Sequence, residues 1–265
     1  MKLLMCSPEM YGVKYEINPW MHTHVVPDLD LAKIQWQAYK TALEEAGAEI
    51  CLIRAQPNQP DMVFTANGGL VFKGQAILAN FRFLERSGEA PAFADWFLSQ
   101  QLKLRVLDAS TCFEGEGDGD GLIMGNRLFA AYRQRTDLAA HKRISQWLDI
   151  QVISLLLINP YFYHLDTCFF PLDQDTALYY PGAFDGTSLQ VLSQWVKHLV
   201  PIEDTDALSF GANGVVVGRK VILPFISFGL QETIKDLGYQ PVLLDFSEFM
   251  KAGGAAKCLV LQLEH

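Results

Sequence analysis

The feature of this sequence that most constrains its fold is a unit that recurs roughly every 45–55 residues. Each unit begins with two short apolar runs separated by a small polar turn, which is the pattern of a β-hairpin. Four such hairpins are predicted, over residues 69–79, 122–131, 167–180 and 214–223. Because a fixed period of this size is typical of repeated architecture, we expect several copies of one α/β unit.

Helical patterns, with apolar residues three and four positions apart, lie between the hairpins. These patterns cover residues 29–46, 92–102, 136–148, 188–199 and 227–237. Short extended segments follow several of the helices, at residues 49–53, 103–107, 151–157 and 240–244. The unit is therefore hairpin, helix, strand, and a fifth copy forms if the last strand, Cys258–Leu263, joins the first, Lys2–Ser7. A closed ring of such units would place the hairpins at the centre and the helices outside.

Composition indicates one compact globular domain. The chain has 265 residues, of which 50% are apolar and 19% are charged. So large an apolar fraction excludes a disordered chain and is enough for a well-buried core. No linker or low-complexity stretch divides the sequence, so residues 1–265 are expected to form a single domain. The net charge of −9 argues against nucleic-acid and polybasic membrane partners, because an acidic surface repels phosphates.

Three features favour a cytoplasmic protein that does not cross a membrane. Even the largely apolar run Val152–Ile158, which Ser154 interrupts, is far shorter than the roughly 20 residues that a span needs. The apolar start meets Pro8 and Glu9 too soon for a signal peptide. Five cysteines, an odd number without a CxxC pair, indicate a reducing compartment. Residues 263–265 resemble the start of an expression tag, so His265 is given no role.

The most unusual segment is Phe113–Gly121, in which four carboxylates alternate with glycine. This much negative charge disfavours a phosphate cradle. A calcium loop that begins at Glu116 has Arg127 at its twelfth position, where a bidentate carboxylate is required. Two interpretations remain: an acidic surface turn, or a glycine-rich backbone that approaches a ligand while Glu114 points into a pocket.

His164 and Asp166 lie two residues apart, just before the third predicted hairpin. On an extended chain their side chains point to the same face, so both could contact one ligand. The alternative is a core histidine that is hydrogen-bonded to the backbone. Asp61 precedes the first hairpin and Asn67 follows it six residues later, still before the hairpin; alone, this segment indicates a turn with a capping aspartate.

The other histidines give weaker signals. His22 and His24 have a spacing that allows a shared metal, but no third ligand is evident, which favours a loop. His141 and His198 are expected on helices among solvent-type residues.

Cys258 follows two glycines and Lys257 at the start of an apolar strand. A cysteine in this setting is usually a small buried hydrophobe. A mobile glycine loop and a neighbouring lysine are also what can expose a thiol and lower its pKa. Both interpretations stay open on the residues alone.

Taken together and in order, these segments resemble the guanidino-group modifying enzymes, a superfamily that includes arginine deiminases, dimethylarginine dimethylaminohydrolases, amidinotransferases and arginine dihydrolases. The motifs that carry the resemblance are Pro60-Asp61 with Phe64, Phe113-Glu114-Gly115, Asp118, His164-Leu165-Asp166-Thr167, Asn213, and Gly253-Gly254 with Cys258. The family fold is a five-bladed α/β propeller of pseudo-repeats (a pentein), which agrees with the repeat described above.

Two further segments look most like the arginine dihydrolase branch. They are Ile17-Asn18-Pro19-Trp20-Met21 and Thr65-Ala66-Asn67. Dimethylarginine hydrolases usually carry acids where this chain has Ala66 and Asn67. Some dihydrolases carry a second, larger domain that this sequence does not contain. The resemblance implies no metal and no organic cofactor, and it leaves the oligomeric state open.

The resemblance makes Cys258 the nucleophile, His164 the general acid and base, and Glu114 the group that orients or charges the histidine. It implies that Asp166 first, and then Asp61, holds the cationic head of a guanidino substrate. Arg135, with Arg82 as second choice, would bind the substrate carboxylate.

Asn18 is expected to close the pocket from the N-terminal loop. Asn67 is expected to allow a second hydrolysis, because an amide can donate to the ureido oxygen of citrulline and also accept from a guanidinium N–H.

The expected reaction is hydrolysis of arginine through a covalent cysteine intermediate, which gives ornithine, carbon dioxide and two ammonia. Alternatives on the same scaffold are dimethylarginine hydrolysis or deimination to citrulline, and amidino transfer to an amine. A non-catalytic propeller that binds a partner or a small molecule is an alternative of a different class. It would be expected to lack catalytic residues, whereas Cys258, His164 and Glu114 are all present.

Overall fold

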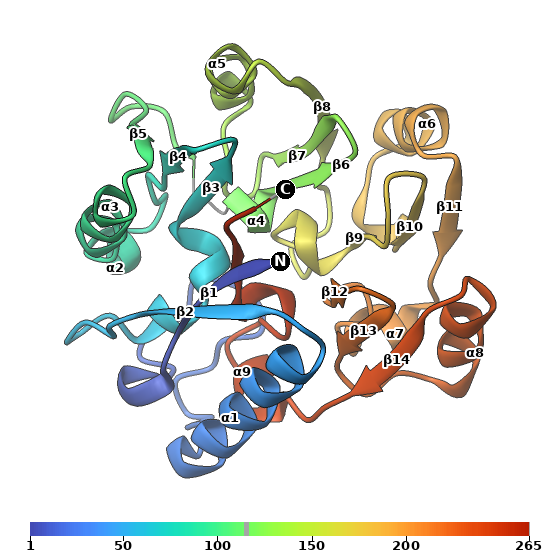
Figure 1. Cartoon of the computed structure of the whole chain (residues 1–265), viewed down its shortest axis with the longest axis horizontal. Helices are drawn as coiled ribbons and strands as arrows, with labels where there is room; N and C mark the ends of the chain where they lie inside the picture. Colours follow the sequence, from blue (N-terminus) through green and yellow to red (C-terminus); the bar gives the residue numbers. More distant parts are fainter. Residues whose placement is uncertain (114–116, 265) are drawn as a thin grey trace.

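A computed structural model describes residues 1–113 and 117–264 of the chain. Five three-stranded sheets surround a common centre, and the principal helices lie outside them (Figure 1). Both ends of the chain lie close to that centre (Figure 1). The α/β propeller expected from the repeat is therefore confirmed.

All five sheets share one strand order, which runs from an inner strand through a middle strand to an outer strand. The five blades, each given in that order, are β15 (Leu261–Gln262), β1 (Lys2–Cys6) and β2 (Glu49–Ile53); β3 (Gly69–Phe72), β4 (Gln75–Leu78) and β5 (Lys103–Arg105); β6 (Gly121–Met124), β7 (Arg127–Tyr132) and β8 (Gln151–Leu156); β9 (Phe169–Pro171), β10 (Thr176–Tyr179) and β11 (His198–Pro201); and β12 (Val215–Val217), β13 (Lys220–Leu223) and β14 (Gln240–Leu243).

In every blade the middle strand pairs antiparallel with the inner strand and parallel with the outer one. A parallel pair needs a crossover connection, and a helix supplies it each time. The crossover helices are α1 (Leu29–Glu45), α3 (Ala90–Ser99, preceded by α2, Leu84–Ser87), α5 (Leu138–Leu148), α6 (Gly186–Trp195) and α8 (Phe228–Asp236). The predicted unit of hairpin, helix and strand is thus the unit of the fold.

The longest described helix, α1, shows why these segments become helical. Asp28 caps its start by accepting hydrogen bonds from two backbone N–H groups of the first turn, and Gly47 follows its end with φ +100°. Trp36 and Tyr39 lie on its buried face, as the apolar spacing predicts. Across residues 1–113 and 117–264, neither this helix nor a shorter one has the length and apolar character needed to span a bilayer.

Pairing between the two ends of the chain completes the first blade. Leu3 of β1 pairs with Gln262 of β15, and Leu4 pairs with Leu261, in antiparallel register. The N–H of Leu263 also donates to the carbonyl of Lys2. The expected fifth copy, made from the first and last strands, is therefore confirmed.

Short turns or loops precede the inner strands and bring the chain to the centre. Four of them are helical turns: η3 (Thr65–Gly68), α4 (Gly117–Asp120), η4 (Leu165–Thr167) and η6 (Lys257–Leu259). The loop before β12 follows α7 (Asp204–Leu208), and further short helices are η1 (Pro8–Met10), η2 (Pro60–Val63), η5 (Pro181–Ala183) and α9 (Ser247–Met250). Because the five blades repeat one topology, residues at equivalent positions in these turns meet near the axis.

The structure corrects several sequence predictions. The helix predicted over residues 188–199 ends at Trp195, because Val196 is extended and His198–Pro201 pairs with β10 as an outer strand. His198 is therefore on a strand. His141 does lie on a helix, but it is buried and contacts the Ser154 hydroxyl and the Ala131 carbonyl.

Cys258 lies in the turn η6 and not at the start of a strand, because the pairing with β1 begins only at Leu261. Likewise His164 and Asp166 do not lie on an extended chain, since residues 165–167 form the turn η4. The glycine-acid segment from 117 onward forms α4 and then the β6–β7 hairpin up to Arg127, which is not a calcium-loop conformation.

The packing of η3 against α3 predicts that Gly68→Ala destabilises the protein. A Cβ at residue 68 would lie 2.3 Å from the ring of Phe93, which is fully buried. We expect the free energy of unfolding to fall by about 1–3 kcal/mol, measured by urea denaturation. Gly186→Ala, where nothing lies within 4 Å, is the matched control and should cause no loss. Equal stability of the two variants would contradict this packing.

Candidate active site

The turns η3 and η6 and the segment that leads into η4 converge with the N-terminal loop on one buried pocket. Its polar and thiol-bearing lining includes Asp61, Asn67, Arg86, Arg135, His164 and Cys258, each 2–3% exposed. Ile17, Asn18, Phe64, Tyr163, Ala252 and Gly254 complete the lining. A larger cavity of about 350 Å³ lies beside β6, β9 and β12 and is mainly apolar. The smaller pocket is therefore the one whose lining is rich in titratable side chains.

The Cys258 thiol lies between an acidic and an amide side chain. Its Sγ donates to Oδ2 of Asp166 at 3.2 Å, and Nδ2 of Asn213 donates to the sulfur, also at 3.2 Å. The three residues come from three successive axial segments of the ring. The sulfur thus has a fixed position at the floor of the pocket.

Asn213 holds the cysteine turn in place. Its Oδ1 accepts from the backbone N–H groups of Ala255 and Lys257, both at 3.1 Å. Its Nδ2 also donates to the carbonyl of Asp166 at 2.9 Å. This fully buried amide ties η6 to η4, and its removal would leave several buried backbone groups without partners.

The thiol is neutral in the free protein. Burial raises the pKa of Cys258 well above its ordinary value, and the nearby charge of Asp166 raises it further. The hydrogen bonds from the Ala255 backbone and from Asn213 oppose this shift in pKa but do not cancel it. A positive charge that entered the pocket would favour the thiolate.

His164 is also held neutral. Burial lowers its pKa well below the ordinary value, and the positive charges of Arg135 and Arg86 lower the pKa further. The ring packs edge-on against Tyr163, with 4.3 Å between the ring centroids. A neutral imidazole that lines the same pocket as a thiol can act as a general base and then as a general acid.

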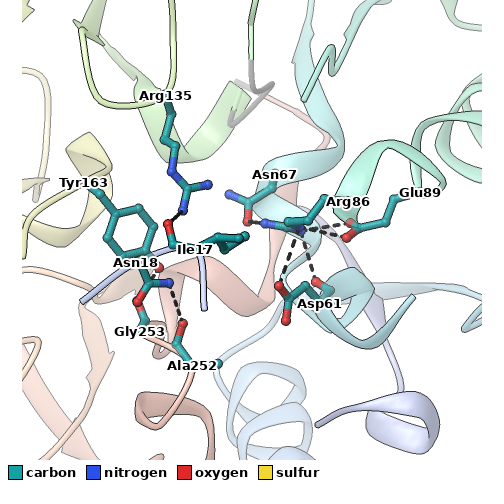
Figure 2. Close-up of polar contacts among 10 residues, drawn as sticks. All are labelled: Ile17, Asn18, Asp61, Asn67, Arg86, Glu89, Arg135, Tyr163, Ala252 and Gly253. Atoms are coloured by element: carbon teal, nitrogen blue, oxygen red, sulfur yellow. Dashed lines mark hydrogen bonds and ion pairs between the residues drawn. The ribbon is translucent and has the colours of Figure 1, made fainter. Parts of the chain in front are cut away.

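Arg135 is clamped from several sides. Its Nη2 donates to the carbonyl of Ile17 at 3.0 Å (Figure 2). The guanidinium carbon lies 4.6 Å from the ring centre of Phe83 and 4.7 Å from that of Tyr163. Such cation–π contacts hold the group rigid at the pocket wall.

Arg86 is the centre of a second polar cluster. Its Nε and Nη2 donate to the two carboxylate oxygens of Glu89 at 2.7 and 2.8 Å. Its Nη1 donates to Oδ1 of Asn67 at 2.5 Å, and its Nη2 donates to the carbonyl of Asp61 at 3.1 Å (Figure 2). Burial raises the pKa of Asp61, an effect that the charge of Arg86 opposes. With both acids ionised, the cluster of two carboxylates and one guanidinium carries a net negative charge.

The N-terminal loop, which contains Asn18, and the loop that contains Gly253 close the pocket together. Nδ2 of Asn18 donates to the carbonyl of Ala252 at 3.0 Å, and the Tyr163 hydroxyl donates to the carbonyl of Gly253 at 2.8 Å (Figure 2). Gly253 has φ +86°, and a Cβ there would lie 2.9 Å from the Tyr163 oxygen. Only glycine fits this close approach.

The structure brings together most residues that the sequence nominated. Cys258, His164, Asp61, Asn67, Asn18 and Arg135 line the pocket, and Asp166 contacts the thiol. Arg82 does not line it; its side chain pairs with Asp137 and donates to the carbonyl of Arg135. Glu114 lies outside the described residues.

Sequence reasoning missed Arg86 and Glu89 and gave Asn213 no role. The Arg-x-x-Glu spacing of the first two is a helix-type ion pair that could have been noticed. Asn213 belongs to the motifs that carry the family resemblance, but the hydrogen bonds of its side chain join residues that lie far away in the sequence. Nothing in its neighbourhood indicates that it would hold a cysteine 45 residues away.

Comparison with known proteins identifies the family. The family model for eukaryotic N,N-dimethylarginine dimethylhydrolase matches residues 27–265. The bifunctional arginine dihydrolase/ornithine cyclodeaminase AgrE of Nostoc is 41% identical over 99% of this chain and 38% of its own length. The dimethylarginine dimethylaminohydrolase of Mycobacterium tuberculosis is 38% identical over 98% of this chain and 84% of its own.

A crystal structure of a point variant of the N-terminal domain of ArgZ, from Synechocystis, covalently bound to a reaction intermediate shares 39% sequence identity with this chain, with a TM-score of 0.95. The match covers 99% of this chain and 97% of that one. The chain belongs to the guanidino-group modifying enzymes, in their arginine dihydrolase branch. It spans 38% of the length of the bifunctional Nostoc relative.

The contact between Asp166 and the thiol predicts the direction of a pKa change. Asp166→Asn removes a negative charge 3.2 Å from the sulfur, so the pKa of Cys258 should fall. The measurement is the ultraviolet absorbance of the thiolate against pH, with Cys258→Ser subtracted. In Asp173→Asn, whose carboxylate accepts from Tyr239, the midpoint should not move. An unchanged or raised midpoint in Asp166→Asn would contradict this electrostatic account.

Proposed function

We propose that this protein hydrolyses free arginine to ornithine, carbon dioxide and two ammonia through a covalent intermediate on Cys258. The observation that carries the proposal is the convergence of a thiol, an imidazole and the Asn67 amide in one buried pocket with carboxylates on its walls. The names of the Nostoc and Synechocystis relatives support the same reaction.

The charges of the pocket suit an amino acid with a cationic head. Asp166 lies beside the sulfur and Asp61 lies on the wall, so both can pair with a guanidinium. Arg135 and Arg86 supply the positive groups for an α-carboxylate. The substrate cation would itself create the nucleophile, because its charge next to the buried thiol favours loss of the thiol proton.

In the first cycle, the neutral His164 imidazole takes the proton of the Cys258 thiol, and the sulfur attacks the guanidinium carbon to form a tetrahedral adduct. His164 protonates the departing nitrogen, the C–N bond breaks, and ammonia leaves an amidino group on the sulfur. His164 then takes a proton from water, which attacks this carbon and releases citrulline and the thiol. Glu114 is proposed to orient or charge the histidine.

In the second cycle, the same groups act on the ureido carbon of citrulline. Loss of a second ammonia gives a thiocarbamate, and its hydrolysis gives a carbamate that loses carbon dioxide to leave ornithine. The sum is one arginine and two waters converted to ornithine, carbon dioxide and two ammonia. Asn67 supports this step by donating to the ureido oxygen, which a third carboxylate would repel.

The second candidate is a single hydrolysis that stops at citrulline, from arginine or dimethylarginine. The family model and the M. tuberculosis relative favour it. Amidino transfer is a third candidate and would need an amine in place of water. In each case the ligand is a small guanidino compound. The five cysteines are all free thiols, which suits the cytoplasmic location that we propose.

The ammonia yield tests the proposal directly. Incubation with arginine should release two ammonia per arginine consumed, with ornithine as the product. Cys258→Ser should lose activity by several orders of magnitude, whereas Cys168→Ser, outside the pocket lining, should retain it. One ammonia with accumulating citrulline would contradict a dihydrolase and favour the second candidate.

Replacing Asn67 by aspartate should shift the product. An aspartate pairs with Arg86 and cannot donate to the ureido oxygen, so citrulline should be released before the second cycle. We expect Asn67→Asp to lower the ammonia yield from about two toward one per arginine, measured with both amino-acid products. An unchanged ratio of citrulline to ornithine would remove Asn67 from the second cycle.

A further inference from the structure

The contact between Arg86 and Asn67 fixes which end of the Asn67 amide faces the pocket. A guanidinium only donates hydrogen bonds and has no acceptor, so the oxygen of Asn67 must point to Arg86. The structure has this arrangement, with Nη1 of Arg86 at 2.5 Å from Oδ1 of Asn67. The reversed amide would set two donors against each other at the same distance.

The Arg86 side chain cannot easily turn away from this contact. Glu89, which is fully buried, holds it through two parallel hydrogen bonds, and the carbonyl of Asp61 accepts a further one. A bidentate pair of this kind fixes the plane of the guanidinium as well as its position. The orientation of Asn67 is therefore built into the protein before a substrate arrives.

The consequence is a donor directed at the ligand. In residues 1–113 and 117–264, Nδ2 of Asn67 is buried and has no hydrogen-bond partner, and Asn67 lines the pocket. A buried N–H₂ without a partner is unfavourable unless a ligand atom supplies an acceptor. The head group of arginine offers only N–H donors, whereas that of citrulline offers a carbonyl oxygen.

We infer that Arg86 is a positioning residue that selects the ureido head of citrulline by orienting the Asn67 amide. This inference rests on the proposed two-cycle function and deepens it. The first cycle depends on the carboxylates that hold the cation. The second depends on a donor that only the Arg86-bound orientation of Asn67 presents.

Arg86 also lines the pocket, so a simple effect on substrate binding has to be separated from this role. Arginine and citrulline carry the same α-carboxylate and the same aliphatic chain. A lost carboxylate contact therefore changes kcat/KM for both substrates by the same factor and cancels in their ratio. A lost orientation of Asn67 affects citrulline alone and does not cancel.

The experiment measures kcat/KM for citrulline divided by kcat/KM for arginine. In Arg86→Gln the partner of Asn67 can donate or accept, so the amide is free to turn, and we expect the ratio to fall about tenfold. Arg86→Lys, which only donates, should keep most of the ratio. Arg143→Gln, on the exposed face of α5, is the matched surface control and should leave the ratio unchanged.

A second variant keeps the test valid if loss of the buried cation prevents folding. Arg86→Gln combined with Glu89→Gln removes both charges, so no carboxylate is left buried without its partner. This double variant should show the same fall in the ratio as Arg86→Gln alone.

A double-mutant cycle then asks whether Arg86 acts through Asn67. In an Asn67→Ala background, Arg86→Gln should cause no further fall in the ratio. An unchanged ratio in Arg86→Gln, or the same fall with and without Asn67, would overturn the inference while leaving the proposed function intact. A wild-type protein that does not hydrolyse citrulline would overturn both.

Discussion

The antiparallel pairing of the two ends of the chain is the contact on which the site depends. Leu3 and Leu4 of β1 pair with β15, so the segment just before β15 is carried to the axis of the propeller. The Thr65 hydroxyl lies within hydrogen-bond distance of the carbonyls of Leu4 and Leu259, which joins the turn of the next blade to the same point. These contacts fix the position of the turn that contains Cys258. Residues on the other side of the pocket are brought toward the axis by the same topology, which is repeated in the other blades.

The charges around Cys258 then determine when its thiol loses a proton and becomes a nucleophile. Burial keeps both the Cys258 thiol and the His164 imidazole neutral, and Asp166 adds to the effect on the thiol. The same carboxylate is placed to hold a guanidinium next to the sulfur, so one group suppresses the thiolate in the free protein and recruits the cation that forms it. We therefore propose that a cationic guanidino ligand activates the Cys258 thiol more strongly than a neutral ligand does.

Local sequence patterns predicted most strands and helices of the blades, whereas tertiary contacts determine the features that those patterns missed. Polar turns between apolar runs gave four hairpins, and Lys73 with Gly74, both at positive φ, shows the backbone that a two-residue turn requires. The helix predicted over residues 188–199 was too long, because β11 forms only through its pairing with β10, which no local pattern encodes. The pairing of β1 with β15 was suggested by the repeat alone.

The roles of the site residues were harder to predict from local sequence patterns. Cys258 and His164 were nominated by resemblance, since a cysteine before an apolar strand is more often a buried hydrophobe. The roles of Arg86 and Asn213 depend on partners 19 and 45 residues away, which only the folded ring brings together. Arg82 was named and Arg86 was missed for the same reason: sequence spacing does not tell which of two nearby arginines faces the pocket.

The proposed reaction requires a covalent bond between the substrate carbon and the sulfur of Cys258. Acid quenching during turnover with arginine, followed by mass spectrometry of the intact protein and of its peptides, detects that bond. The account predicts an adduct with the mass of arginine less one ammonia, confined to the peptide that contains Cys258 and absent from Cys258→Ser. Steady turnover of arginine with no adduct on that peptide, or with an adduct on another residue, would contradict it.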